Sequence, residues 1–227
     1  MSGLIARAAR FELPRPEPAE EAGAPLGDLR FRKLLREEEW TALPSAIRRR
    51  FSKRLADGAT ALYVGTVTEC RMSRAGWWLA QGGRLIGAPL PLRAETGVPS
   101  AVAVTEDGAC GGQVWTRLYA RRRGFPQVIH SAKRFAGPTG LEEHVGWGVG
   151  MALTVHVEEG ALVFRSAGYF VQAFGHRFAL PGWATPGALA VTHAEAGEGA
   201  FRFTLEIVHP SLGLLLRQEG LFREAHP

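Results

Sequence analysis

The chain has 227 residues, of which 46% are apolar and 22% are charged, close to the values of an average globular protein. These figures argue against wholesale disorder, and the length suits one β-rich domain. The 27 Lys and Arg against 22 Asp and Glu give a net charge of +5. This charge is milder than that of a dedicated nucleic-acid binder, so we expect no specific nucleic-acid partner.

The N-terminus and the cysteines indicate a cellular compartment. Arg7 and Arg10 interrupt the segment where a signal peptide needs a continuous apolar run. No stretch approaches the roughly 18 apolar residues of a membrane helix. Cys70 and Cys110 have no further ligand at metal spacing, and two cysteines are too few for a disulfide scaffold. We therefore predict a cytoplasmic protein with reduced thiols, no metal site and no cofactor.

Residues 1–27 differ in composition from the rest of the chain. Prolines recur among Glu and Ala at positions 14, 16, 18 and 25. Such a segment cannot bury enough apolar surface to become ordered. We predict a disordered leader over residues 1–27 and a single domain over residues 28–227.

Helical patterns come next in the chain. Asp28 can cap a helix in DLRFRKLLREEEW, where the apolar residues form a rough stripe. A second helix opens with Pro44 in PSAIRRRFSKRLADG, and Gly58 is a natural stop. The segment RMSRAGWWLAQGGRL predicts a third, short helix.

After Gly58 the apolar pattern changes from helical spacing toward alternation. Turn signals such as Asp107-Gly108 and RRRGF separate segments that read as about nine strands, one of which spans EEHVGWGVGMALTVHV with a glycine bend inside it. Short connections imply antiparallel neighbours. We predict a β-dominated α+β fold, with a strongly curved antiparallel sheet or partly closed barrel and two or three N-terminal helices packed on it.

The segment WTRLYARRRGFPQVIHSAKRF, residues 115–135, carries the candidate site. Strand alternation places Trp115, Arg117 and Tyr119 on one face, and we expect His130 and Arg134 across the hairpin. Residues 121–123, all Arg, fall at the tip, where solvated charge is the simplest interpretation. An arginine between two aromatic residues is either stacked beside water or held in a cavity to meet an anion.

Glu143 completes the candidate site. Adjacent strand residues point to opposite faces, so Glu143 and His144 are not expected to share a site, whereas Glu143 can face Arg117 inside the sheet. We assign no catalytic or metal-binding residue. The predicted ligand-binding residues are Trp115, Arg117, Tyr119, His130 and Glu143.

Several segments in order resemble one family. They are LPSAIRRRF, VWTRLY, LEEHVGWG, GALVF, ALPGW and FRFTLEIVHPSLGLLLRQEGLF. Over about residues 40–223 the chain resembles the domain of unknown function 4166 family. The resemblance implies a β-rich domain, which stands alone or follows another domain, and supplies no catalytic residues.

Three functions remain open. The first is noncatalytic binding of a small, largely apolar or amphiphilic ligand, with an anionic head that Arg117 meets, in a pocket of the curved sheet. The second is an enzyme that uses the same pocket, with Arg117 as an anion clamp and Glu143 or His130 as the acid–base group. The third is a basic surface, made by the second helix and the RRRG tip, that binds nucleic acid or touches an acidic membrane peripherally; it requires these two elements to be neighbours.

Overall fold

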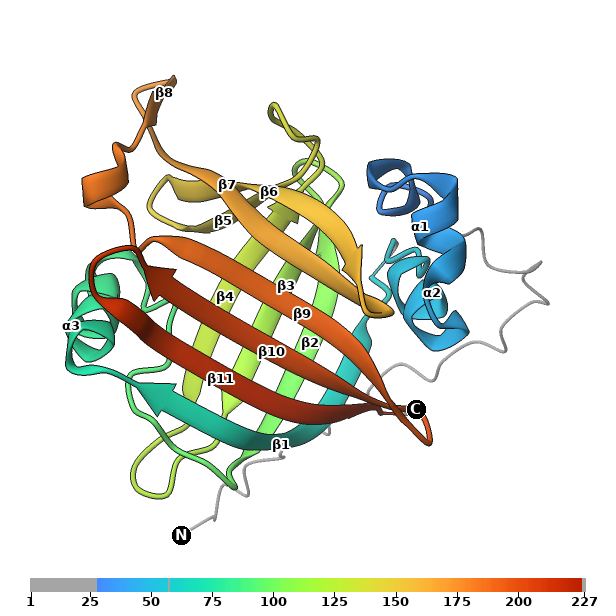
Figure 1. The fold of residues 1–227 in the computed structure, drawn as a ribbon, viewed down its shortest axis with the longest axis horizontal. Coiled ribbons are helices and arrows are strands. Elements are labelled where there is room, and N and C mark those ends of the chain that lie inside the picture. The colour runs from blue at the N-terminus through green and yellow to red at the C-terminus, as the bar shows by residue number, and fades with distance from the viewer. Residues whose placement is uncertain (1–27, 57, 226–227) are drawn as a thin grey trace, which may run out of the picture.

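Ten antiparallel strands close into a barrel in the computed structural model, which describes residues 28–56 and 58–225 (Figure 1). The predicted leader, residues 1–27, lies outside the described residues. The strands are β1 (Ala61–Met72), β2 (Pro99–Asp107), β3 (Gly112–Tyr119), β4 (Gln127–Arg134), β5 (Glu142–Gly146), β6 (Val149–Glu158), β7 (Ala161–Ala173), β8 (His176–Ala179), β9 (Ala188–Gly197), β10 (Ala200–His209) and β11 (Gly213–Glu224).

The barrel is closed by the pairing of β7 with β9 and by the pairing of β1 with β11. Neighbours along the chain pair from β1 to β7, then β9 joins β7, and β10 and β11 follow. The antiparallel pairing of β1 with β11 completes the ring, while β8 extends β7 outside it. The predicted β-dominated antiparallel fold is confirmed.

The strand count differs from the prediction at the glycine bend. The segment expected as one strand is two, β5 and β6, joined by a turn at Trp147 and Gly148, whose φ angles are +50° and +76°. Gly146 pairs with Val149 across this turn. The glycines therefore reverse the chain instead of bending a continuous strand.

Short helices close one end of the barrel: η1 (Arg32–Leu34), α1 (Glu37–Ala42) and α2 (Ser45–Phe51). The continuous helix expected from Asp28 is wrong, because Leu35 is extended and Asp28 binds the Arg30 guanidinium instead of capping a helix. The second helix ends at Phe51, well before Gly58. Burial of Phe31 and Phe51 against the barrel breaks the local helical pattern here.

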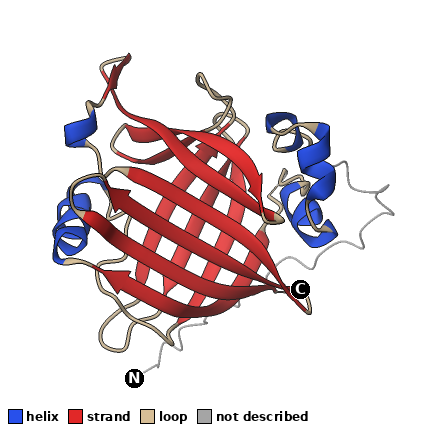
Figure 2. Cartoon of the chain, in the orientation of Figure 1, coloured by secondary structure: helices blue, strands red, loops and turns tan. Residues whose placement is uncertain are grey.

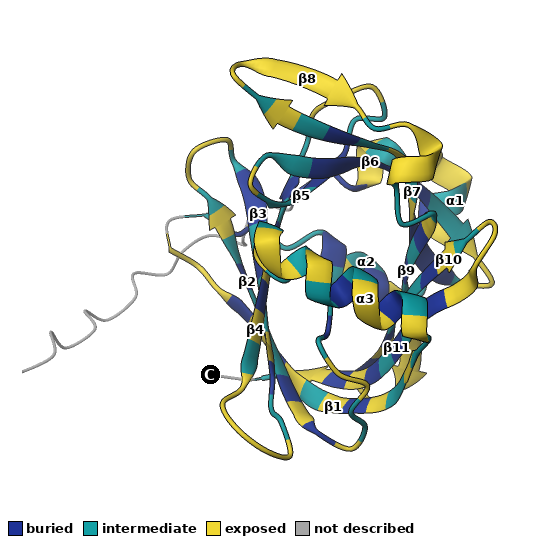
Figure 3. Ribbon diagram, turned by 90° about the vertical axis from the view of Figure 1, so that its left-hand side faces the viewer, coloured by how far each residue is buried: buried dark blue, intermediate teal, exposed yellow. Residues whose placement is uncertain are grey.

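The other end of the barrel, which we call the mouth, is crossed by α3 (Arg74–Gly82) and the following turn η2 (Gly83–Ile86) (Figure 3). This helix is the third one predicted. Ser73 caps it by accepting a hydrogen bond from the Gly76 N–H. A Cβ on Gly76 would lie 1.9 Å from the Leu215 carbonyl oxygen, so glycine allows α3 to pack against β11.

Figure 2 shows how little helix the fold contains beside its strands; the last helical turn is η3 (Gly182–Ala184), between β8 and β9. Within residues 28–56 and 58–225, every helix is too short or too polar to cross a lipid bilayer.

Candidate binding cavity

A cavity of about 460 Å³ occupies the mouth half of the barrel. Its walls are mainly aliphatic, and α3, η2 and the segment before β9 contribute to them. Its polar residues are Arg117, Tyr119, Ser131, Glu143, Tyr169 and Gln218. An apolar cavity of this size with a few converging polar groups is the usual form of a small-molecule site.

Four predicted site residues line this cavity or its neighbour. Arg117, Tyr119 and Glu143 line the main cavity. Trp115 lies deeper, beside a second space of about 20 Å³ that Arg117 and Tyr119 also border. Strand alternation therefore placed the three β3 residues on the inner face, as expected.

His130 is not part of the site. Trp115 pairs with Ser131 and Arg117 pairs with Ile129. The inner face of β4 is therefore formed by Ile129, Ser131 and Lys133, whereas His130 is exposed and contacts the Thr116 hydroxyl. The expected placement of His130 and Arg134 across from Arg117 was wrong because seven residues, 120–126, separate β3 from β4. Because the loop has an odd number of residues, odd-numbered positions of β3 pair with odd-numbered positions of β4. Arg117 therefore lies opposite Ile129 and not opposite His130.

A charged group of three side chains lies at the cavity wall. The Lys133 Nζ is 3.0 Å from Glu143 Oε2, and the Arg117 Nη2 is 3.6 Å from Glu143 Oε1. Arg117 also donates from Nη1 to the Ser131 hydroxyl at 3.0 Å. Burial raises the pKa of Glu143, but the charges of Lys133 and Arg117 outweigh it and lower that pKa to about 2. Glu143 is therefore a stable carboxylate at neutral pH.

The charge balance of this group is positive. Arg117 and Lys133 share one carboxylate, and burial lowers the pKa of Lys133 below its usual value even though Glu143 opposes this shift. With Glu143 ionised and both cations protonated, the group carries one excess positive charge. Such an excess inside an apolar wall favours an anion in the cavity.

The inner polar residues that sequence reasoning missed include Ser131, Lys133, His193 and Gln218. The first two follow from the correct hairpin register. His193 lies among the rings of Phe51, Trp115, Phe164, Phe201 and Phe203, and burial holds its pKa well below the usual value. Its Nδ1 and the Gln218 Oε1 have no hydrogen-bond partner among the described residues. No short motif in the sequence distinguishes either of them.

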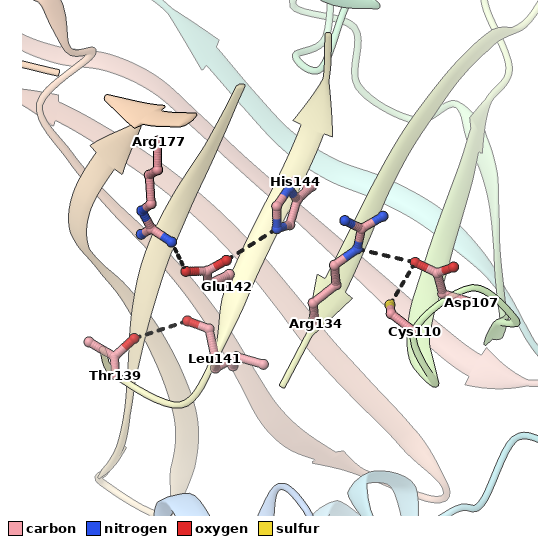
Figure 4. A network of polar contacts seen from close by, with 8 residues as sticks. All are labelled: Asp107, Cys110, Arg134, Thr139, Leu141, Glu142, His144 and Arg177. Carbon is pink, nitrogen blue, oxygen red and sulfur yellow. Dashed lines mark hydrogen bonds and ion pairs between the residues drawn. The ribbon is translucent and has the colours of Figure 1, made fainter. Parts of the chain in front are cut away.

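The outer face of β5 carries a separate polar network (Figure 4). Glu142 lies between His144, at 3.3 Å, and Arg177 of β8. Arg134 reaches Asp107 at 3.3 Å. Glu143 and His144 thus face opposite sides of the barrel wall, as alternation predicts.

The two basic elements considered in the sequence lie apart. The α2 helix is at the closed end, where Phe51 packs against Phe164. The β3–β4 tip is near the mouth, where Arg122 donates to the Thr96 carbonyl in the loop after η2. The condition for a combined basic surface, that these elements be neighbours, is not met.

Within residues 28–56 and 58–225, no three His, Cys, Asp or Glu side chains are arranged to hold a metal ion.

The comparisons with known proteins identify one family. Searches of curated proteins and of solved structures found no match. The model of the domain of unknown function DUF4166 matches residues 43–222, most of the barrel and α2. The chain therefore belongs to the DUF4166 family.

Proposed function

We propose that the barrel binds a small, largely apolar molecule with an anionic head group. The observation that carries this proposal is Arg117, a cation in the wall of an apolar cavity of about 460 Å³. That volume lies within the usual range of ligand sites, roughly 300 to 1,000 Å³. The apolar walls favour a hydrocarbon or aromatic body.

Arg117 has donor capacity left for a ligand. Its Nη1 donates to Ser131, but its Nη2 stands 3.6 Å from Glu143, beyond ordinary hydrogen-bond distance. Tyr119 lines the same cavity from the same face of β3. A carboxylate or sulfonate next to Arg117 would gain a charge-assisted hydrogen bond and balance the excess positive charge.

The enzyme alternative has weaker support. A general base works best with a pKa near the operating pH, and the pKa of Glu143 is lowered to about 2. His130, the other suggested acid–base group, is exposed on the outer face of β4. We therefore assign Glu143 the role of counterion that holds Arg117 and Lys133 in place.

Two fluorescent probes test the proposal. Anilinonaphthalene sulfonate carries an anionic head, and N-phenylnaphthylamine has nearly the same apolar body without it. Both should bind the delipidated protein. Arg117→Ala should weaken the sulfonate by about ten- to a hundredfold, since a hydrogen bond to a charged group contributes roughly 1.5–3 kcal/mol, and should leave the neutral probe unchanged.

The matched control is Arg202→Ala, an arginine that is half-exposed on β10 and lies outside the cavity lining. It should affect neither probe. Equal binding of the sulfonate to wild type and Arg117→Ala would contradict the head-group assignment. Failure of both probes to bind would contradict the cavity itself. Mass spectrometry of small molecules released from the purified protein by denaturation would then identify the natural ligand class.

A further inference from the structure

Exposed tryptophans gather at the mouth of the barrel. Of the six tryptophans, Trp40 and Trp115 are buried. The other four are exposed and lie on α3, the β5–β6 turn and η3: Trp77, Trp78, Trp147 and Trp183. Trp147 and Trp183 are 82% and 85% exposed. Large exposed apolar patches that polar residues surround mark sites of protein, membrane or ligand contact.

These elements surround the opening of the cavity. The Leu85 side chain on η2 lines the cavity and is itself 82% exposed, so the apolar lining continues onto the outer surface. Ala184, next to Trp183, also lines the cavity. The β5–β6 turn touches η2, since a Cβ on Gly146 would lie 2.4 Å from the Ile86 carbonyl oxygen. Figure 3 looks into this end of the barrel, with α3 across it.

The same elements lack acidic residues. The chain contains 22 Asp and Glu, but none falls in residues 73–93, 144–150 or 166–187. These three segments carry the exposed cations Arg74, Arg84 and Arg93. Arg177 is also exposed, but it forms an ion pair with Glu142. The nearby β3–β4 tip, residues 120–126, adds three arginines and Phe125, again without an acid. The mouth is thus apolar and predominantly basic, although the Glu95 carboxylate accepts a hydrogen bond from the Arg122 backbone N–H beside it.

We propose that the mouth docks on the surface of an anionic lipid bilayer. Tryptophan prefers the boundary between hydrocarbon and water, because its ring is apolar and its N–H can hydrogen-bond. Arginines beside it attract the anionic head groups of the lipids. Docking would bring the cavity opening against a reservoir of amphiphilic molecules. That consequence rests on the proposed function, whereas the docking itself does not.

Charge and side-chain type favour a bilayer over other partners. A nucleic acid could pair with the arginines of the mouth. It would leave the four exposed tryptophans around the cavity opening without an apolar surface to contact. A second copy of the chain would place one basic mouth against another, and like charges would repel. A bilayer with anionic lipids satisfies both the apolar and the basic parts of the mouth.

Co-sedimentation with lipid vesicles tests the docking. Wild type should bind vesicles of phosphatidylcholine with phosphatidylserine much more tightly than vesicles of phosphatidylcholine alone, and added salt should weaken the binding. The triple variant Trp78→Ser, Trp147→Ser, Trp183→Ser should lose binding by a factor on the order of ten or more. Brominated lipids should quench the tryptophan emission of wild type.

Matched controls separate docking from general effects on the protein. Leu29→Ser with Leu62→Ser and Val64→Ser removes three exposed apolar side chains away from the mouth and should retain vesicle binding. Arg74→Ser with Arg84→Ser should lose preference for phosphatidylserine, whereas Arg49→Ser with Arg54→Ser, at the closed end, should keep it. Circular dichroism should show all variants folded, since each changed side chain is exposed.

Three outcomes would overturn the inference: wild type stays in solution with both kinds of vesicle, the control variants lose binding as much as the mouth variants, or wild type self-associates through the tryptophans in sedimentation experiments. Normal binding of the two fluorescent probes together with no vesicle binding would contradict docking alone. Vesicle binding without probe binding would contradict only the proposed cavity function.

Discussion

Lys133 and Glu143 form an ion pair inside the barrel, with 3% and 8% of their side chains exposed. Their charged atoms are 3.0 Å apart, and Arg117 approaches the same carboxylate from the cavity side. Because water is nearly excluded, each charge depends on the others for stabilisation. The carboxylate is therefore both a structural element and the means of positioning Arg117.

Removing that carboxylate should destabilise the protein. Glu143→Gln leaves Arg117 and Lys133 facing each other without a counterion, and breaking a buried ion pair costs about 3–5 kcal/mol. Urea unfolding measures the loss. As a control, Glu206→Gln breaks the half-exposed pair with Arg217 and should cost less than about 1 kcal/mol. Similar losses for the two variants would contradict a special role for the inner pair.

Acid should weaken the fold through the same group. The folded pKa of Glu143 is lowered from 4.5 to about 2, so the unfolded chain takes up a proton at higher pH than the folded protein. Its stabilising contribution is complete above about pH 5 and is lost as the pH falls toward about 2. Urea midpoints measured across this window should fall more steeply in wild type than in Glu143→Gln. Parallel pH profiles would contradict the prediction.

His193 should make stability depend on pH in a higher range. Burial among aromatic rings lowers its pKa well below 6.5, so the unfolded chain is protonated first as the pH falls through about 6.5. Wild type should therefore lose thermal stability from about pH 7 downward, and His193→Phe should reduce this loss. The exposed His176→Phe serves as control and should leave the profile unchanged. If His193→Phe had the same dependence of thermal stability on pH as wild type, other titrating groups would be responsible for it, and the prediction would be contradicted.

The position of α3 over the mouth depends on Gly76. A methyl group there would meet the Leu215 carbonyl at 1.9 Å, so Gly76→Ala should displace the helix and cost about 1–3 kcal/mol, as overpacking usually does. Gly82→Ala, in the same helix with nothing within 4 Å, should be neutral or stabilising by up to about 1 kcal/mol. Thermal unfolding compares the two. Equal effects would argue against a packing role for Gly76.

Alternation predicted much of the site because it acts within one strand. Trp115, Arg117 and Tyr119 follow each other at every second position of β3, so their common face needed no knowledge of neighbouring strands. His130 was misplaced because it depends on how β4 is aligned with β3. That alignment is set by a tip whose arginines and glycine allow several turn lengths. The same uncertainty hid Lys133, the direct partner of Glu143.

The N-terminal helices show where a local sequence pattern does not predict the structure. The apolar stripe after Asp28 indicated one helix, but Phe31 is buried by T-shaped contacts with Phe51 and Phe135. Those contacts involve segments far along the chain and override the weak local preference for helix. The closure of the barrel was also beyond the sequence, because a curved sheet and a closed one have the same alternation.

The pairing of β1 with β11 has a consequence for how the protein is made. Residues 61–72 must wait for residues 213–224 to leave the ribosome before the ring can close. Pairings between such distant segments slow folding. In the meantime β1 and β10 each have an edge that can recruit strands from other chains, and the aromatic interior is open to water. We expect nascent chains to need chaperone protection until β11 has been synthesised, and the cavity to exist only from that moment.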